Sequence, residues 1–198
     1  MTLITLVRHG QTDWNLNGRI QGRTDIPLND TGRDQARDAA ASLLDRGHTL
    51  VVASPLSRAF ETASIIATEL GLDAPLAHPG LIERDYGIGE GMSDADIERE
   101  MTERGLTVRA FFRSPPGGED DAAVAARAVP ALREIAAHHE GPVIAVAHGA
   151  FIRVALEQAG GHGLGPIVNG SAHDILVDDE TFEHVPDGLR DERMARSA

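Results

Sequence analysis

A histidine between an arginine and a glycine, Arg8-His9-Gly10, stands directly after the short apolar run from Leu3 to Val7. That run has the length and composition of one buried strand. In α/β proteins, sites form at the carboxyl ends of such strands, and a glycine there leaves room for a ligand. An imidazole beside a fixed positive charge suits an anion, and a phosphate most of all. The triplet therefore predicts an anion-facing site at the end of the first strand.

Two further segments carry basic side chains to the ends of predicted strands. After the apolar run 49–53, Ser54-Pro55 predicts a helix with Ser54 as its N-cap and Pro55 at its first position, which puts Arg58 in the first turn. After the run 142–147, His148-Gly149 again follows a strand with a His-Gly pair. If these strands are neighbours, two imidazoles and two guanidinium groups meet at one sheet edge, beside a helix N-terminus that also favours anions. We therefore predict one phosphate site built from these strand ends.

Three acidic residues, Glu83, Asp85 and Glu90, lie in a glycine-rich stretch between residues 81 and 91. A carboxyl group beside a phosphate pocket can protonate a departing oxygen. Composition does not say which of the three would do so, because the chain has 31 acidic residues in all. The stretch predicts an acid loop in which the identity of the acid stays open.

Strands and helices must alternate to bring these segments together. Apolar runs predict strands at 3–7, 49–53, 74–78 and 142–147, helical spacing predicts helices at 31–45, 54–70, 93–104, 119–139 and 150–159, and 169–183 suggests a terminal β-pair. This alternation predicts an α/β fold, a three-layer α/β/α sandwich whose open, mostly parallel sheet has helices on both faces. The stretch 10–30 lacks periodicity, which predicts a functional loop. We expect one domain over residues 1–198, with a loose tail from about 186 to 198.

The composition excludes several classes of site. With Lys+Arg 18 and Asp+Glu 31 the net charge is −13, so nucleic acid and anionic membranes are not expected partners, and a phosphate site must be a local positive pocket. The chain has no cysteine, which excludes cysteine-nucleophile phosphatases and thiolate metal sites. It also has no lysine, which excludes phosphate loops of the Gly-Lys-Ser/Thr type. The N-terminus shows no signal-peptide pattern, so we expect a cytoplasmic protein.

Taken together and in this order, the motifs resemble those of the histidine phosphatase superfamily, in its phosphoglycerate-mutase-like branch. The matching segments are Arg8-His9-Gly10, the helix start from Ser54 to Ala63, Glu83 four residues before Gly87, His148-Gly149, and Pro116 to Glu119. The similarity runs from residue 3 to about residue 155, and its spacing suits a small phosphatase of that branch. The four main motifs are specific as a set, although each alone is weak.

The resemblance implies a role for each of five catalytic residues. His9 would be the nucleophile and would form a phosphohistidine. Arg8, Arg58 and His148 would hold the phosphoryl group during its transfer. Glu83 would donate a proton to the leaving group, and as a carboxylate it would then draw a proton from water.

The resemblance also implies a substrate-binding set around the phosphoryl oxygens. Asn15 and Gln21 match family positions that contact these oxygens, and the backbone amide of Gly149 would add another donor. No metal ion and no other cofactor is expected, because two guanidinium groups and an imidazole supply the positioning and the charge. One position departs from the pattern, since Gly89 stands where many phosphatases of this branch have an aromatic residue.

The sequence thus predicts an enzyme, a metal-independent phosphomonoesterase that hydrolyses small phosphorylated metabolites through phospho-His9. Two alternatives stay open, a cofactor-dependent phosphoglycerate mutase and a non-catalytic module that binds phosphorylated ligands. The presence of His9, Glu83 and both arginines argues against the binding module. The segment from about Asp85 to Phe112 follows no pattern that names the substrate, and the oligomeric state stays open.

Overall fold

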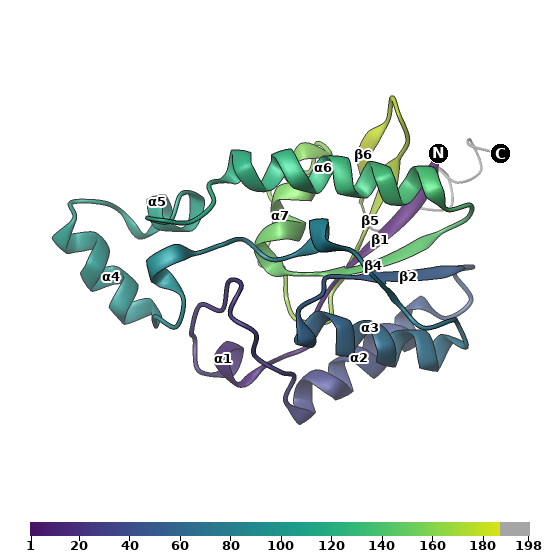
Figure 1. The fold of residues 1–198 in the computed structure, drawn as a ribbon, viewed down its shortest axis with the longest axis horizontal. Helices are drawn as coiled ribbons and strands as arrows, with labels where there is room; N and C mark the ends of the chain where they lie inside the picture. The colour runs from purple at the N-terminus through teal and green to yellow at the C-terminus, as the bar shows by residue number, and fades with distance from the viewer. Residues whose placement is uncertain (187–198) are drawn as a thin grey trace.

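The computed structural model describes residues 1–186, which include a six-stranded open sheet with strand order β3-β2-β4-β1-β5-β6 (Figure 1). The strands are β1 (Thr2–Arg8), β2 (Leu50–Ala53), β3 (Leu76–Ala77), β4 (Val143–Ala147), β5 (Ala172–Val177) and β6 (Phe182–Val185). β3, β2, β4 and β1 pair in parallel, whereas β5 and β6 pair antiparallel. The predicted α/β fold with a mostly parallel sheet is therefore confirmed.

Helices cover both faces of this sheet. They are α1 (Asp13–Leu16), α2 (Asp30–Leu43), α3 (Ser57–Leu70), α4 (Asp94–Glu103), α5 (Val108–Arg113), α6 (Asp121–His138) and α7 (Gly149–Gln158). Figure 1 shows α2 and α3 on one face and α6 and α7 on the other, with α4 and α5 beyond the sheet. Within residues 1–186, no helix combines the length and the apolar character needed to cross a membrane.

Each face of the sheet has its own apolar core. Ile144 and Val146 of β4 pack in the cluster that joins the sheet to α2 and α3. Val143 and Ala145 of the same strand pack in the cluster that includes Leu132 of α6. Successive side chains of a strand point to opposite faces, so a strand buried on both sides is apolar throughout. This pattern made β4 recognisable in the sequence and places it at the centre of the sandwich.

The parallel strands bring three site segments to one edge of the sheet. β4 lies between β1 and β2, with Ala147 paired to Arg8 and Val146 paired to Ala53. The next residues along these strands are His9, Ser54 and His148. The predicted meeting of the two histidines at one sheet edge is therefore confirmed, and Ser54 joins them there.

The predicted start of α3 is wrong. The helix begins at Ser57, and its N-cap is Leu56 at φ −66° and ψ 135°, without a side-chain cap. The Ser54 hydroxyl does not cap the helix, because it is hydrogen-bonded to His148 Nε2 at 2.7 Å. Arg58 still falls in the first turn of α3, as predicted.

Two other differences concern short elements. The predicted loop 10–30 contains the one-turn helix α1, which Thr12 caps by accepting a hydrogen bond from Asn15 N. Helix α5 was not predicted at all. The other predicted strands and helices are present with small shifts at their ends. The predicted loose tail lies outside the described residues from position 187 on.

Two glycines let the chain after β1 pass close to α2. A Cβ at Gly10 would lie 2.2 Å from the Gly32 carbonyl oxygen, and a Cβ at Gly32 would lie 2.1 Å from the Gln11 carbonyl oxygen. Both clashes are with backbone, so a larger residue at either position must push the segments apart. Gly10 thus fixes how closely the His9 backbone packs against α2.

Candidate active site

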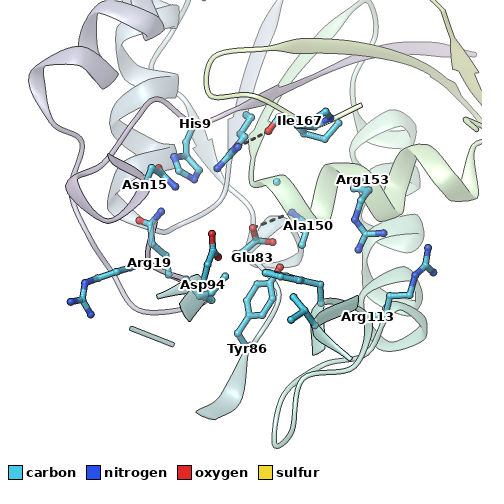
Figure 2. Close-up of a pocket in the computed structure, with 18 of the residues that line it drawn as sticks. His9, Asn15, Arg19, Glu83, Tyr86, Asp94, Arg113, Ala150, Arg153 and Ile167 are labelled. Carbon is cyan, nitrogen blue, oxygen red and sulfur yellow. Dashed lines mark hydrogen bonds between the residues drawn. The ribbon is translucent and has the colours of Figure 1, made fainter. Parts of the chain in front are cut away.

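A cavity of about 1180 Å³ opens at the carboxyl edge of the sheet (Figure 2). Seven of the eight predicted site residues line it: Arg8, His9, Asn15, Gln21, Arg58, Glu83 and Gly149. His148 is not in the lining, but its ring centroid lies 5.1 Å from that of His9. Six arginines and four carboxylates line the cavity in a chain of net charge −13, which makes it the expected local positive pocket.

The buried ring of His9 has one engaged and one available nitrogen. Its Nδ1 lies 2.7 Å from the Gly10 carbonyl oxygen, and because a carbonyl only accepts, Nδ1 carries the proton. Burial, together with the guanidinium groups of Arg58 and Arg8, holds the pKa of His9 well below its usual value. The neutral ring therefore carries its lone pair on Nε2, the form that a nucleophile requires.

Ser54 holds the ring of the second histidine, His148, in place, a role that the sequence did not indicate. The Ser54 hydroxyl oxygen lies 2.7 Å from His148 Nε2, and it also accepts a hydrogen bond from Leu56 N at 3.4 Å. Burial, followed by the charge of Arg58, holds the pKa of His148 well below its usual value, so this ring is neutral too. The Ser54 oxygen has two lone pairs and one proton, so besides accepting from Leu56 N–H it can either donate to Nε2 or accept from it, and it holds the ring in both cases.

Backbone carbonyls orient both arginines of the site. Arg58 is fully buried, and its two terminal nitrogens donate to Thr24 O at 2.9 Å and to Gly22 O at 2.7 Å. Arg8 donates to Ile167 O. Burial lowers the pKa of both guanidinium groups, whereas the nearby Glu83 carboxylate opposes that shift. The two cations are therefore fixed in place at the end of the sheet.

Three buried nitrogens at this site lack a partner. Within residues 1–186, six buried side-chain nitrogen or oxygen atoms make no hydrogen bond, and three of them are Arg8 Nε, Arg58 Nε and His148 Nδ1. Arg8 Nε and Arg58 Nε each carry an N–H, and an unpaired buried donor costs about 1–3 kcal/mol. Donors of this kind beside a cavity form a ready site for the oxygens of an anion.

Glu83 joins the acid loop to the N-terminus of α7. Its Oε1 accepts hydrogen bonds from Arg84 N at 2.8 Å and Phe151 N at 3.1 Å, and its Oε2 accepts one from Ala150 N at 3.2 Å (Figure 2). Carboxylates are favoured at helix N-termini, where unpaired N–H groups and the helix dipole meet. Glu83 lines the cavity, whereas Asp85 does not. Among the open candidates for the acid, the geometry therefore favours Glu83.

Asn15 and Gln21 line the cavity with amide groups whose oxygens are held by other residues. Asn15 Oδ1 accepts from Thr12 N at 3.2 Å and from Asn169 Nδ2 at 3.3 Å, and Gln21 Oε1 accepts from Thr12 Oγ1 at 2.9 Å. Both oxygens are thus engaged, while neither amide NH₂ makes a hydrogen bond in the described part of the chain. Both residues line the cavity, so these NH₂ groups are available to an anion.

A distant arginine holds the backbone that carries Glu83. Arg127 of α6 donates to Ile82 O at 2.7 Å and to Glu83 O at 3.0 Å. Its Nε and one terminal nitrogen also bind the two carboxylate oxygens of Glu119, each at 3.0 Å. Charge-assisted, bidentate pairs of this kind fix geometry well. The sequence did not indicate Arg127, because only the fold brings it beside a loop 44 residues away.

The missing aromatic residue at position 89 is supplied by another part of the chain. A Cβ at Gly89 would lie 2.2 Å from Phe111 Cζ, so the buried Phe111 ring fills the space in front of this glycine. That ring stacks on Tyr86 with centroids 6.1 Å apart. Phe112 lines the cavity beside Tyr86. Gly89 thus lets α5 pack against the acid loop, which brings α5 to the cavity.

We expect Gly89→Phe to lower the free energy of unfolding by about 1–3 kcal/mol, because the new ring overpacks the space that Phe111 fills. Phe111→Ala alone should cost about 3–5 kcal/mol by leaving a cavity. The double variant should be clearly more stable than the sum of these losses predicts, since each change compensates the other. Urea denaturation of the four proteins measures the coupling, and strictly additive losses would contradict the packing.

Comparison with known proteins agrees with this site. The chain belongs to the histidine phosphatase superfamily (branch 1), whose family model matches residues 4–174. It is accordingly a phosphatase of this superfamily, related to phosphoglycerate mutases.

Three relatives illustrate the similarity. The chain is 40% identical over 163 residues to the uncharacterized phosphatase PhoE of Bacillus subtilis, covering 81% of this chain and 79% of that one. It is 34% identical over 188 residues to a metal-independent phosphoserine phosphatase of Arabidopsis thaliana, covering 92% and 79%. Among solved structures, a mycobacterial glucosyl-3-phosphoglycerate phosphatase complexed with VO3 matches with a TM-score of 0.81 and 31% identity, covering 93% and 97%.

Proposed function

We propose that this phosphatase hydrolyses small phosphorylated metabolites without a metal ion, through a phosphohistidine on His9. The observation that carries the proposal is a neutral histidine with a free Nε2, beside three buried nitrogens that lack partners, two of them guanidinium N–H donors. Phosphoryl transfer needs mainly positioning and charge stabilisation, which guanidinium and imidazole groups can supply. The name of the metal-independent relative in Arabidopsis thaliana supports the same reading.

In the first step, His9 Nε2 attacks phosphorus and the bond from phosphorus to the ester oxygen breaks. Arg8 and Arg58 bind the equatorial oxygens, and the Nδ1–H of His148 donates to one of them. The leaving oxygen takes the proton of the Glu83 carboxyl group. The alcohol departs, and the phosphoryl group stays on His9.

In the second step, water attacks the same phosphorus from the side that the alcohol has left. The Glu83 carboxylate takes a proton from this water, the bond from phosphorus to Nε2 breaks, and His9 recovers its lone pair. Inorganic phosphate is released with Glu83 protonated for the next cycle. Asn15, Gln21 and the amide of Gly149 donate to the phosphoryl oxygens in both steps, which keeps the group in line with the attacking atom.

In this mechanism, the hydrogen bond between Ser54 and His148 sets the tautomer of the histidine. A neutral imidazole has two tautomers, and only the Nδ1–H form can donate to a phosphoryl oxygen while Nε2 faces Ser54. We expect Ser54→Ala to populate the other tautomer and to lower kcat/KM by about tenfold, the value of one hydrogen bond to a charged group. Nitrogen-15 spectra of the His148 ring distinguish the two tautomers directly.

Ser64→Ala is the matched control for this variant, because Ser64 lies on α3, the helix that follows Ser54, and its hydroxyl donates to Phe60 O. It should change neither the ring nitrogen shifts nor kcat/KM. An unchanged tautomer in Ser54→Ala would show that Ser54 does not set the proton position of His148.

The experiment that tests the proposed function is a hydrolysis assay with p-nitrophenyl phosphate and a panel of metabolite phosphates, with and without EDTA. We expect hydrolysis that chelation does not reduce. Conversion of 3- to 2-phosphoglycerate far above hydrolysis would instead identify the mutase alternative. Measurable binding of phosphate esters without turnover of any ester in the panel would identify the non-catalytic module.

A further inference from the structure

The cavity extends well beyond the residues that the chemistry needs. Its volume of about 1180 Å³ exceeds what one phosphoryl group occupies, so most of it is available to the rest of the substrate. The outer walls carry charged side chains from three helices: Asp94 and Glu98 of α4, Arg109 and Arg113 of α5, and Arg153 and Glu157 of α7. These side chains face the space that is left for the rest of a substrate.

Arg113 and Arg153 are held together as one cationic group. Asp121 binds both, with distances of 3.0 Å to Arg113 and 3.0 Å to Arg153, and it also binds the buried Arg84. Glu157 lies 2.9 Å from Arg153 and 4.0 Å from Arg113. Three guanidinium groups therefore share two carboxylates, which leaves an excess positive charge at this wall.

Arg109 adds a second positive charge to the same wall. It lies one turn before Arg113 on α5, and residues four apart share a face of a helix. Both line the cavity, and Arg109 is exposed and forms no ion pair or hydrogen bond with any described residue. The packing of Phe111 against Gly89 holds α5 in this position.

In the outer cavity, away from Glu83, the carboxylates are Asp94 and Glu98 on the opposite lip and the paired Glu157. Figure 2 shows Asp94 on one side of the cavity and Arg113 and Arg153 on the other. An anion in the outer cavity is therefore directed toward α5 and α7, away from α4. A guanidinium group with free N–H donors suits a carboxylate or a phosphate, which accept in a bidentate manner.

We propose that the preferred substrate carries a second anionic group, a carboxylate or a phosphate, which Arg109 and Arg113 bind with the support of Arg153. This inference rests on the proposed function, since it places the ester phosphate at His9. It assigns the outer wall of the cavity a specificity role that the catalytic residues do not have.

The test compares two esters that differ in one group. Glycerol 3-phosphate and 3-phosphoglycerate share the same skeleton, and a carboxylate replaces a hydroxymethyl group. We expect kcat/KM to favour the carboxylate by at least about tenfold, mainly through a lower KM. Fructose 6-phosphate and fructose 1,6-bisphosphate form the second arm, which shows whether the second anion is instead a phosphate.

Arg109→Gln should reduce the preference for the doubly charged ester to nearly one, and Arg109→Glu should invert it. These variants carry the test, because Arg109 has no ion pair within residues 1–186 whose loss would disturb folding, whereas Arg113 does. Arg99→Gln is the control, since Arg99 is exposed on α4, where it binds Asp96, and should keep the full preference.

No preference in either arm would overturn the inference, and so would a preference that persists in both Arg109 variants. These outcomes differ from a failure of the proposed function. If p-nitrophenyl phosphate is hydrolysed but neither pair is discriminated, only the second anion site is wrong. If no phosphate ester is hydrolysed, the proposed function itself is wrong.

Discussion

His9→Ala is expected to lower kcat for phosphate-ester hydrolysis by about 10⁴-fold or more, since loss of a covalent nucleophile removes the whole two-step pathway. The remaining arginines can still hold a phosphate, so inorganic phosphate should continue to bind at the site. Steady-state assays with p-nitrophenyl phosphate measure the loss, and isothermal titration with phosphate measures the binding that remains.

The control for this variant is His138→Ala. His138 is exposed near the end of α6, where its Nδ1 is hydrogen-bonded to the carbonyl oxygen of Glu134. It lies outside the cavity and should keep wild-type kcat. A His9→Ala protein that is folded by circular dichroism and still turns over at the wild-type rate would contradict the assignment of His9.

Glu83→Gln is expected to slow the hydrolysis of different substrates to different extents, according to their leaving groups. An alkyl alcohol needs a proton as it departs, so kcat for glycerol 3-phosphate should fall by about 10²–10⁴-fold. The nitrophenolate ion departs without one, so the first step with p-nitrophenyl phosphate should persist while the attack of water slows. In stopped-flow absorbance, we expect a rapid burst of nitrophenol followed by slow turnover.

Asp85→Asn is the matched control, because Asp85 belongs to the same loop but does not line the cavity. Its carboxylate accepts from Gly87 N at 2.8 Å and faces Arg23 at 3.6 Å. The variant should show the wild-type dependence on the leaving group. Equal losses with both substrates in Glu83→Gln, without a burst, would indicate that Glu83 only holds α7 in place.

The sequence predicted the strands that position the site because their signal is local. β2 and β4 are continuous apolar runs and β1 is largely apolar up to Val7, and polar residues follow at Arg8, Ser54 and His148. Parallel pairing then brings these ends together. For this reason the two histidines and Arg58 were placed correctly without any three-dimensional information.

The parts that the sequence did not predict depend on contacts between distant segments. Helix α5 has only six residues, and it is held by Phe111 against Gly89, which are 22 positions apart. Ser54 follows the pattern of a helix cap, and only the position of His148, 94 residues away, makes its hydroxyl a partner of the ring. Local patterns carry no information about such pairs. The walls of the cavity and the substrate class could therefore be inferred only with the structure.

The proposed mechanism requires that a phosphoryl group resides on His9 during turnover. The most direct measurement is rapid mixing with p-nitrophenyl phosphate, a base quench that preserves phosphohistidine, tryptic digestion and mass spectrometry. Cleavage after Arg8 and Arg19 releases peptide 9–19, in which His9 is the only histidine. We expect one acid-labile phosphoryl group on this peptide, at higher occupancy in Glu83→Gln. A phosphoryl group on peptide 134–153, which contains His148, or steady turnover with no phosphopeptide at any mixing time, would contradict it.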